Sequence, residues 1–495
     1  MKNPLRILYV SPEVSPFVMT TDLADFAGSL PKYLKNLGHD IRVMMPNYKY
    51  VNERKYVLRD VIRLHGLNIK MGDEVLAANG KSAFIPGSKV QVYFLDNKML
   101  FERDGLYLDR STGQLYEDNT KRFVFFAIAC LETLKLLHWQ PDIIHCNDWQ
   151  TGLIPMLLKS LYNKDPFFKN SKTLFSLYDG ESQSMFDASV IQLAGAEESF
   201  LQTSRCAANG QISGMCAGVE YSDLTAINIE CVDGELLAEQ GFSQLQELFK
   251  DEASKIAGVG LGIDDQVWNP ETDELLAAQY SRDDLSGKLQ NKRSFMDALG
   301  LEFNEATPLA CMFVNIEREE MALLETKIAT MTQSGMQVAV LAFGDSVDTS
   351  RFATIEKGGE GKVAVKSARD QKLQHLAKAG SDFGVSACEA SRFALSILHS
   401  LAYGTVPIVK SSPAFAGPVE QFDLEKGAGN GFVFKGTKPA EYADAIRNAI
   451  ACFRNKAAWN AIVRNAMESD ASWSAVAPKY VKLYQKLASG KSSKN

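Results

Sequence analysis

The sequence lacks any long apolar run: in 495 residues, no stretch approaches the roughly 18 consecutive apolar residues that a membrane-spanning helix needs. It also lacks a surplus of positive charge, since the formal net charge is −7 at pH 7. Without a basic field the chain has little attraction to phosphate, which argues against nucleic acids and anionic membranes as partners. The apolar run at residues 7–10 is too short for a secretion signal. We therefore predict a cytoplasmic protein with no nucleic-acid and no membrane partner.

The cysteines lack the spacing of a metal or disulfide motif. The chain has eight of them, scattered and with no C-x-x-C pair. Structural metal sites usually pair their cysteines closely, and disulfide frameworks are typical of short secreted chains. This pattern favours reduced, mostly buried thiols. We predict no metal, no cofactor and no disulfide.

The chain alternates strand-like and helix-like patterns in both halves. With 46% hydrophobic and 23% charged residues it has an ordinary globular composition, but it is too long for a single core. The clearest predicted elements are the strands 6–10, 40–45, 310–314 and 337–343 and the helices 23–37 and 321–334. Such alternation is typical of βαβ units and parallel sheets. We predict an α/β protein with two Rossmann-like domains and a ligand site in the cleft between them.

Four polar residues lie after predicted strands. The helix after the first strand opens on Asp22 and Asp25, which predicts Asp22 as the N-cap and Asp25 three positions later. Asp148 precedes a predicted helix at 153–162 and is also predicted as a cap. Tyr178 follows a strand, where a tyrosine is usually a packing residue.

Residues 7–17 resemble the opening of bacterial glycogen and starch synthases, in which the string K-T-G-G-L-A-D follows. Here residues 19–25 read M-T-T-D-L-A-D. Residues 142–153, 262–270 and 280–292 resemble further motifs of that family, and the resemblance covers about residues 5–178 and 258–485. Ser472-Trp473, with Tyr480 and Tyr484, resembles the family's terminal helix. The resemblance implies an α/β fold of the GT-B type, with two Rossmann-like domains facing each other across a cleft.

The resemblance also implies where the domains lie. We place the acceptor-side domain at residues 1–245 and the nucleotide-sugar domain at residues 246–470. A helix at 471–488 is expected to cross back to the first domain, and 489–495 form a polar tail. Residues 179–255 depart from the family, so we assign no site residue there.

Five positions at which the family carries a catalytic group hold other residues in this chain. By resemblance, Met19 replaces the lysine that meets the donor diphosphate, and Tyr178 replaces the histidine beside the transferred glucose. Ile316 and Met321 replace the arginine and lysine that neutralise the leaving nucleoside diphosphate. Ser391 replaces the family's glutamate. No catalytic position of the family is therefore intact among these five.

Two nearby residues carry charges of the sign that the family has at these positions, but each lies two residues away from the aligned position. Arg318 lies two residues from Ile316, and Glu389 lies two residues before Ser391. Side chains two positions apart should not share a direction, so we do not expect either residue to substitute. In the first domain, Glu13, Asp25 and Asp148 match acidic residues of the family's cleft wall. We take these three as acceptor-site candidates.

Three functions fit this pattern. The favoured hypothesis is a pseudoenzyme that binds an α-glucan such as glycogen, or regulates glucan synthesis, without transferring glucose. The second is an active retaining glycosyltransferase that extends α-1,4-glucans, or uses another donor, through non-standard residues. The third is a structural subunit of a hetero-oligomer, with an active synthase paralogue as candidate partner. The missing donor-side groups argue against ADP-glucose binding, so the enzyme assignment stays open and the substitutions favour inactivity.

Overall fold

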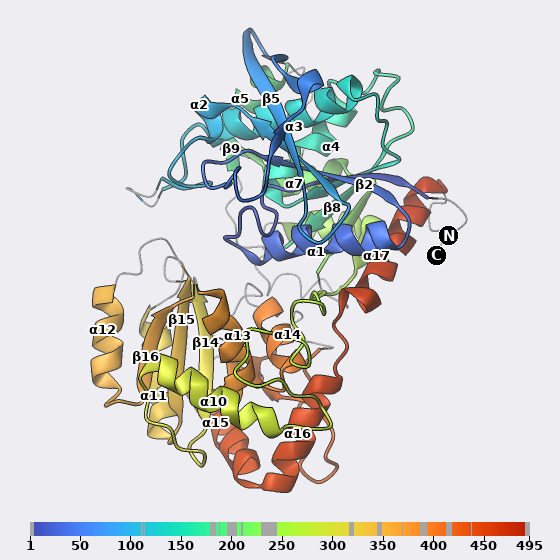
Figure 1. Ribbon diagram of the computed structural model, residues 1–495. Helices are drawn as coiled ribbons and strands as arrows, with labels where there is room; N and C mark the ends of the chain where they lie inside the picture. The colour runs from blue at the N-terminus through green and yellow to red at the C-terminus, as the bar shows by residue number, and fades with distance from the viewer. Residues whose placement is uncertain are drawn as a thin grey trace. The chain divides into compact units, whose positions relative to one another are not determined.

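The structure, a computed structural model, describes residues 4–109, 112, 114–178, 185–187, 189–195, 205–208, 211–228, 245–315, 321–343, 349–368, 370–386, 394–411, 418–436 and 438–490. The chain divides into two compact units (Figure 1). Unit 1 comprises Met1–Gly260 and Val476–Asn495, and unit 2 comprises Leu261–Ala475. Within the described residues, no helix is both long and apolar enough to span a membrane.

Unit 1 is built on a mixed sheet with the strand order β13-β12-β8-β7-β1-β2-β6-β5-β3, and β4 pairs with β5. The strands are β1 (Arg6–Val10), β2 (Asp40–Pro46), β3 (Arg59–Asp60), β4 (Leu67–Met71), β5 (Glu74–Phe84), β6 (Gln91–Asp96), β7 (Ile143–Asn147), β8 (Lys172–Leu177), β12 (Leu224–Ile227) and β13 (Ile256–Gly258). From β13 to β6 every neighbouring pair is parallel. The chain order of the strands reverses between β1 and β7, which makes this pair the switch point of the sheet.

A second, small antiparallel sheet in unit 1 consists of β9 (Met185–Asp187), β10 (Ala207–Ala208) and β11 (Gln211–Ser213). The helices of the unit are α1 (Asp22–Asn36), α2 (Lys98–Phe101), α3 (Asn119–Leu136), α4 (Leu153–Lys159), α5 (Ser189–Ala194), α7 (Gly214–Tyr221) and α9 (Gln246–Asp251), with the 3-10 turns η1 (Ile62–Leu64), η2 (Trp149–Thr151) and η4 (Ala253–Lys255). The last helix, α17 (Trp473–Ala488), starts in unit 2 and ends in unit 1.

Unit 2 contains a fully parallel sheet with the order β16-β15-β14-β17-β18-β19. Its strands are β14 (Leu309–Asn315), β15 (Gln337–Phe343), β16 (Val363–Ser367), β17 (Phe383–Ser386), β18 (Val406–Lys410) and β19 (Phe432–Phe434). Its helices are α10 (Ser286–Leu299), α11 (Met321–Gln333), α12 (Thr349–Gly358), α13 (Gln371–Gly380), α14 (Ala394–Ala402), α15 (Pro439–Arg454) and α16 (Lys456–Glu468). In chain order the strands run 3-2-1-4-5-6, which is the doubly wound Rossmann order.

The sheet of unit 2 is buried on both faces. Along β14, Met312 belongs to an apolar cluster with Leu324 of α11, whereas the next residue, Phe313, packs with Phe295 of α10 and Leu376 of α13. Successive side chains of a strand point to opposite faces, so helices on both sides require an apolar residue at every position. This explains why the strands read as short continuous apolar runs. The prediction of an α/β fold with parallel sheets is confirmed.

Candidate functional site

The predicted site residues of unit 1 gather at the carboxyl ends of three neighbouring strands. Glu13 and Met19 lie in the loop after β1, Asp148 directly follows β7, and Tyr178 directly follows β8. In open α/β sheets, ligands bind outside the carboxyl ends of the strands at the switch point, which here lies between β1 and β7. The position of these residues therefore agrees with the rule for this class of sheet.

Glu13 holds the loop between β1 and α1 together. Its side chain is 1% exposed, and its carboxylate accepts hydrogen bonds from the Thr20 N–H (2.7 Å), the Thr20 hydroxyl (2.8 Å) and the Tyr107 hydroxyl (2.9 Å). Burial raises the pKa of Glu13, and these hydrogen bonds oppose the rise. A glucan contact at this carboxylate stays a prediction, because the bonds described are internal to the protein.

The predicted helix cap at Asp22 was wrong. Thr21 is the N-cap, in extended conformation, and Asp22 is the first helical residue. Thr21 makes no side-chain cap bond, because its hydroxyl instead donates to Oε1 of Glu13 at 3.4 Å. Asp25 lies in the first turn of α1 and is half-buried. A hydrogen bond to Glu13, eight residues earlier in the same loop, thus takes the place of the local capping bond.

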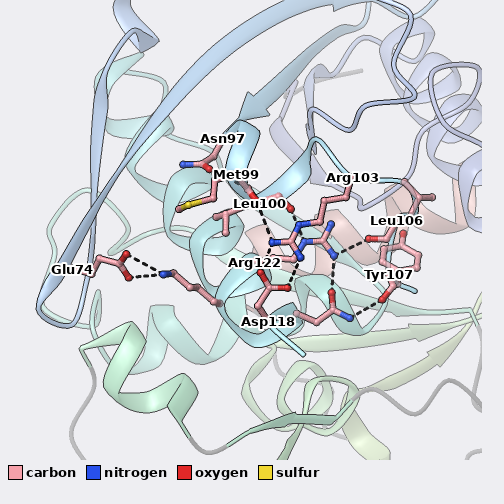
Figure 2. A network of polar contacts seen from close by, with 11 residues as sticks. Glu74, Asn97, Met99, Leu100, Arg103, Leu106, Tyr107, Asp118 and Arg122 are labelled. Carbon is pink, nitrogen blue, oxygen red and sulfur yellow. Dashed lines mark hydrogen bonds and ion pairs between the residues drawn. The ribbon is translucent and has the colours of Figure 1, made fainter. Parts of the chain in front are cut away.

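Tyr107 is a site residue that the sequence analysis missed, and a buried arginine stabilises the segment that carries it (Figure 2). Arg122 is fully buried and donates to the Leu106 carbonyl (2.9 Å) and to Oδ1 of Asn119 (2.7 Å). Asn119 in turn donates to the Tyr107 carbonyl at 2.9 Å. Burial lowers the pKa of Arg122. No local motif signals this support, because Tyr107 is 94 positions away from Glu13.

Met19 places a neutral, partly exposed thioether at the position where the resemblance expects a lysine. Its side chain is 55% exposed, and the Ser15 hydroxyl lies 3.4 Å from its sulfur. A thioether carries no charge and is only a weak hydrogen-bond acceptor. It cannot replace an ammonium group opposite a diphosphate.

Tyr178 and Asn147 hydrogen-bond to each other. The family resemblance implies a histidine at the position of Asn147, in the motif at residues 142–153, and another at the position of Tyr178. The Tyr178 hydroxyl donates to Oδ1 of Asn147 at 2.9 Å and lies 3.3 Å from the Tyr9 hydroxyl. Asn147 donates onward to the Val10 carbonyl at 2.9 Å, and the Tyr178 ring packs against Phe26 with centroids 4.8 Å apart. Burial raises the pKa of Tyr178 well above its ordinary value, so the phenol stays neutral. The packing role predicted for Tyr178 is therefore only part of what this residue does.

His145, in β7, is neutral and bonded through both ring nitrogens. Its Nδ1 lies 2.8 Å from the Tyr484 hydroxyl of α17, and its Nε2 lies 2.7 Å from the Ser176 hydroxyl. Burial lowers the pKa of His145 to about 3. An imidazole with this pKa is not a general acid near neutral pH, and its two hydrogen bonds tie β7 to β8 and to α17.

Asp148 has a backbone conformation that is rarely adopted by residues other than glycine. Its φ is 62° and its ψ is 175°, and its carboxylate accepts a hydrogen bond from the Trp149 N–H at 2.8 Å. The predicted cap is confirmed, although it caps the short turn η2 rather than α4 itself. Such a conformation costs about 1–3 kcal/mol and is found mainly at functional sites, where the surrounding structure enforces it.

The predicted donor-side residues fall largely outside the described part of the chain. Ile316, Arg318, Glu389 and Ser391 are not among the described residues, and of Met321 only the backbone is described, as the first residue of α11. In the sequence, Ile316 comes directly after β14, and Ser391 comes after β17. These two strands form the switch point of the sheet in unit 2, so their chain positions fit a ligand-binding edge.

Comparison with known proteins shows the family. A family model described as the starch synthase catalytic domain matches residues 6–250. The glycogen synthase of Chlorobium limicola is 33% identical to this chain over 489 residues, which cover 98% of the chain and 99% of that relative. This chain belongs to the glycogen and starch synthase family. The resemblance inferred from the motifs is confirmed.

Solved structures show the same fold. The catalytic domain of starch synthase IV from Arabidopsis thaliana, bound to ADP and acarbose, matches this glycogen synthase family member with a TM-score of 0.87 at 23% identity, covering 98% of this chain and 100% of that chain. A sucrose-phosphate synthase from Thermosynechococcus elongatus matches with a TM-score of 0.62 at 13% identity, covering 98% and 100% of the two chains. The GT-B class of the α/β fold is confirmed.

Proposed function

We propose that this member of the glycogen synthase family has lost glucosyl transfer from ADP-glucose and is retained as a glucan-binding or regulatory pseudoenzyme. The observation that carries the proposal is the hydrogen bond from Tyr178 to Asn147. Tyr178 and Asn147 hold two of the positions at which the family resemblance expects histidines, and Gln150 holds a third. A neutral phenol bonded to an amide offers the transferred glucose no group that titrates near neutral pH.

The chemistry of the reaction explains why these losses matter. A nucleoside diphosphate leaves with negative charge, which fixed cations must stabilise in the transition state. The neutral residues Met19, Ile316 and Met321 stand at the three cation positions. Removing a single such stabilising group typically slows catalysis about 100- to 1,000-fold. The effects are not additive, but together they leave little rate above the uncatalysed reaction.

The histidine that remains, His145, does not compensate for those that the resemblance expects at positions 147, 150 and 178. His145 is fully buried, its pKa is lowered to about 3 by burial, and both of its nitrogens bond hydroxyl groups. Exchanging a proton with a substrate would require breaking one of these buried bonds and charging the ring in an apolar environment. The network therefore supports a structural role for this histidine.

Retention of glucan binding is supported by the acceptor side of unit 1. Asp148 keeps a strained conformation, and the Glu13 loop is held by hydrogen bonds from Thr20 and Tyr107. Strain of this kind is expected to be lost by mutation where no ligand or fold constraint maintains it. The family relationship and the strained carboxylate together favour an α-glucan as the ligand.

The decisive experiment measures incorporation of labelled glucose from ADP-glucose into a glycogen primer, beside an active family member as positive control. We expect no incorporation above background for this protein. We expect the same for Met19→Lys, because the remaining cation and histidine positions stay neutral. Clear turnover by the unmodified protein would overturn the proposal and support the alternative of an active enzyme with non-standard residues.

Glucan binding is tested separately by co-sedimentation of the purified protein with glycogen. We expect the unmodified protein to sediment with the glucan and Asp148→Ala to bind it more weakly. Asp142→Ala serves as a matched control, since Asp142 lies at the opposite end of β7 beside Arg6. An unmodified protein that does not sediment would favour the alternative of a structural subunit in a hetero-oligomer.

A further inference from the structure

Three side chains with metal-ligating atoms converge in unit 1, outside the site described above. Cys206 lies directly before β10, whereas Cys216 and Glu220 both lie on α7. The two sulfurs and one carboxylate oxygen all lie within 4.8 Å of one another. Because Cys216 and Glu220 are four residues apart on a helix, they share one face, and that face is turned toward Cys206.

The two oxygens of Glu220 have different partners. Oε1 accepts from Nε of Arg205 at 3.3 Å, and Oε2 lies 2.8 Å from the Cys206 sulfur, whose thiol donates to it. Carboxylates that bind metals are typically oriented in this way, with one oxygen held by a second partner and the other directed at the ion. Arg205 is itself held by Glu252 at 2.6 Å.

The cluster is shielded from solvent. Cys206 and Cys216 are 4% and 7% exposed, and the side chain of Glu220 is 11% exposed. Burial, with the neighbouring Cys216 and Glu220, raises the pKa of Cys206, so without a metal its thiol keeps its proton. A divalent metal ion would displace protons from thiols in such a site, because coordination deprotonates them.

We propose that Cys206, Cys216 and Glu220 form a binding site for a thiolate-preferring divalent ion of the zinc(II) class. Both sulfurs bind as thiolates, Oε2 of Glu220 is the third ligand, and water completes the tetrahedral shell. Two protons pass to solvent as the ion binds. The ion offsets two of the three negative ligand charges, and the Arg205 guanidinium, which also pairs with Asp251 and Glu252, lies beside the third. Sulfur ligands select zinc over magnesium or calcium, which prefer all-oxygen sites.

The metal site would link the small antiparallel sheet, through Cys206 beside β10, to α7. This helix packs against η2, the turn that follows Asp148. At Gly214 an added Cβ would lie 2.6 Å from the Trp149 carbonyl oxygen. The Ser213 hydroxyl caps α7 by accepting from the Cys216 N–H at 3.2 Å. A metal ion on this helix would therefore stabilise the support of η2. This inference does not depend on the proposed loss of glucosyl transfer.

The test uses the full chain, treated with a chelator and titrated with Co²⁺ and with Zn²⁺. We expect a sulfur-to-cobalt charge-transfer band and one tightly bound zinc per chain by elemental analysis. Cys206→Ser and Cys216→Ser should abolish the band. Arg205→Gln should keep it but weaken metal affinity by about 10- to 100-fold, the usual effect of removing an outer-shell partner.

Cys452→Ser is the matched control, because this buried cysteine lies in unit 2. It should bind the metal like the unmodified protein. The proposal is overturned if the unmodified protein, folded by circular dichroism, shows no charge-transfer band. It is also overturned if peptide mapping of freshly purified protein finds Cys206 and Cys216 joined as a disulfide that, once reduced, still binds no metal. The spectrum of the unmodified protein decides the question even if the serine variants do not fold.

Discussion

The two units each bury a polar network around histidine, and the networks differ in charge. In unit 1, Tyr178, Asn147 and His145 join hydroxyl, amide and neutral imidazole groups. In unit 2, Nδ1 of His375 lies 2.7 Å from Oδ2 of Asp273, and the Tyr403 hydroxyl donates to the same oxygen at 2.6 Å. One network is built from neutral groups, and the other is centred on a carboxylate.

The network of unit 2 is stabilised by that carboxylate. Burial alone would raise the pKa of Asp273, but hydrogen bonds from His375, Tyr403 and the Leu275 N–H outweigh burial and lower it. Trp268 stacks on the rings of His375 and His399, with centroids 4.0 Å apart in both pairs. Trp268 belongs to a stretch that resembles the family, whereas the same resemblance expects histidines where Tyr178 and Asn147 stand. The comparison shows two ways of satisfying buried polar groups: neutral hydrogen bonds in unit 1 and bonds to a carboxylate in unit 2.

The largest effect should come from removing the carboxylate of unit 2. Asp273→Ala leaves Nδ1 of His375 and the Tyr403 hydroxyl without their acceptor, so the free energy of unfolding should fall by about 3–5 kcal/mol. Urea denaturation followed by tryptophan fluorescence measures it. Asp283→Ala, at an exposed position, should change stability by less than about 0.5 kcal/mol. If Asp273→Ala lowers the free energy of unfolding by less than about 1 kcal/mol, the Asp273 carboxylate does not stabilise this network as proposed.

The network of unit 1 should respond to pH through His145. Burial lowers the pKa of His145 to about 3, so below an unfolded pKa near 6.5 the unfolded chain binds a proton that the folded chain does not. Its contribution to stability is fully present above pH ~6.5 and declines by about 1.4 kcal/mol per pH unit as the pH falls toward the folded pKa.

Between pH 6.5 and 5, the unmodified protein should therefore lose about 2 kcal/mol more than His145→Gln does. Urea denaturation of both proteins at several pH values gives the difference directly. Parallel pH profiles for the two proteins would show that His145 is not buried as a neutral imidazole.

Removing the phenol hydroxyl of Tyr178 should reduce the free energy of unfolding by less than the Asp273→Ala change does. Tyr178→Phe leaves Oδ1 of Asn147 without its donor, so the free energy of unfolding should fall by about 1–2 kcal/mol. Tyr9→Phe is the matched control in the same network, because the contact of Tyr9 with Tyr178 is longer, at 3.3 Å. Its effect should be smaller. If both variants lose the same free energy of unfolding, the hydrogen bond from Tyr178 to Asn147 contributes no more to stability than the contact with Tyr9.

The smallest effect concerns the backbone strain at Asp148. Asp148→Gly and Asp148→Ala both lose the bond to the Trp149 N–H, but glycine adopts the observed φ of 62° without strain. After the greater entropy of the unfolded glycine chain is subtracted, Asp148→Gly should be more stable than Asp148→Ala by about 1 kcal/mol. At Asp142, which has no positive φ, alanine should be the more stable. Thermal unfolding measures the stability of the four variants. If alanine is more stable than glycine at both positions, the backbone at Asp148 is not strained.

The positions of the elements were predictable because they depend on local periodicity. The predicted strand at 337–343 coincides with β15, and the predicted helix at 321–334 differs from α11 by one residue. Both patterns reflect burial on one or two faces, which the residue types reveal directly. The cap at Asp22 was not predictable, because Glu13 takes the Thr21 hydroxyl only once the loop has folded.

The sequence by itself determined the family and the α/β fold, since both depend on residue identity and spacing along the chain; that five catalytic positions are replaced stays a prediction from the resemblance. Only the tertiary structure decided which partners the buried polar groups find. Tyr178 bonds Asn147, Tyr107 bonds Glu13, and Tyr484 bonds His145, pairs that lie 31, 94 and 339 positions apart. Buried polar groups must find partners wherever the fold provides them, so distance in space and not order in the chain selects those partners.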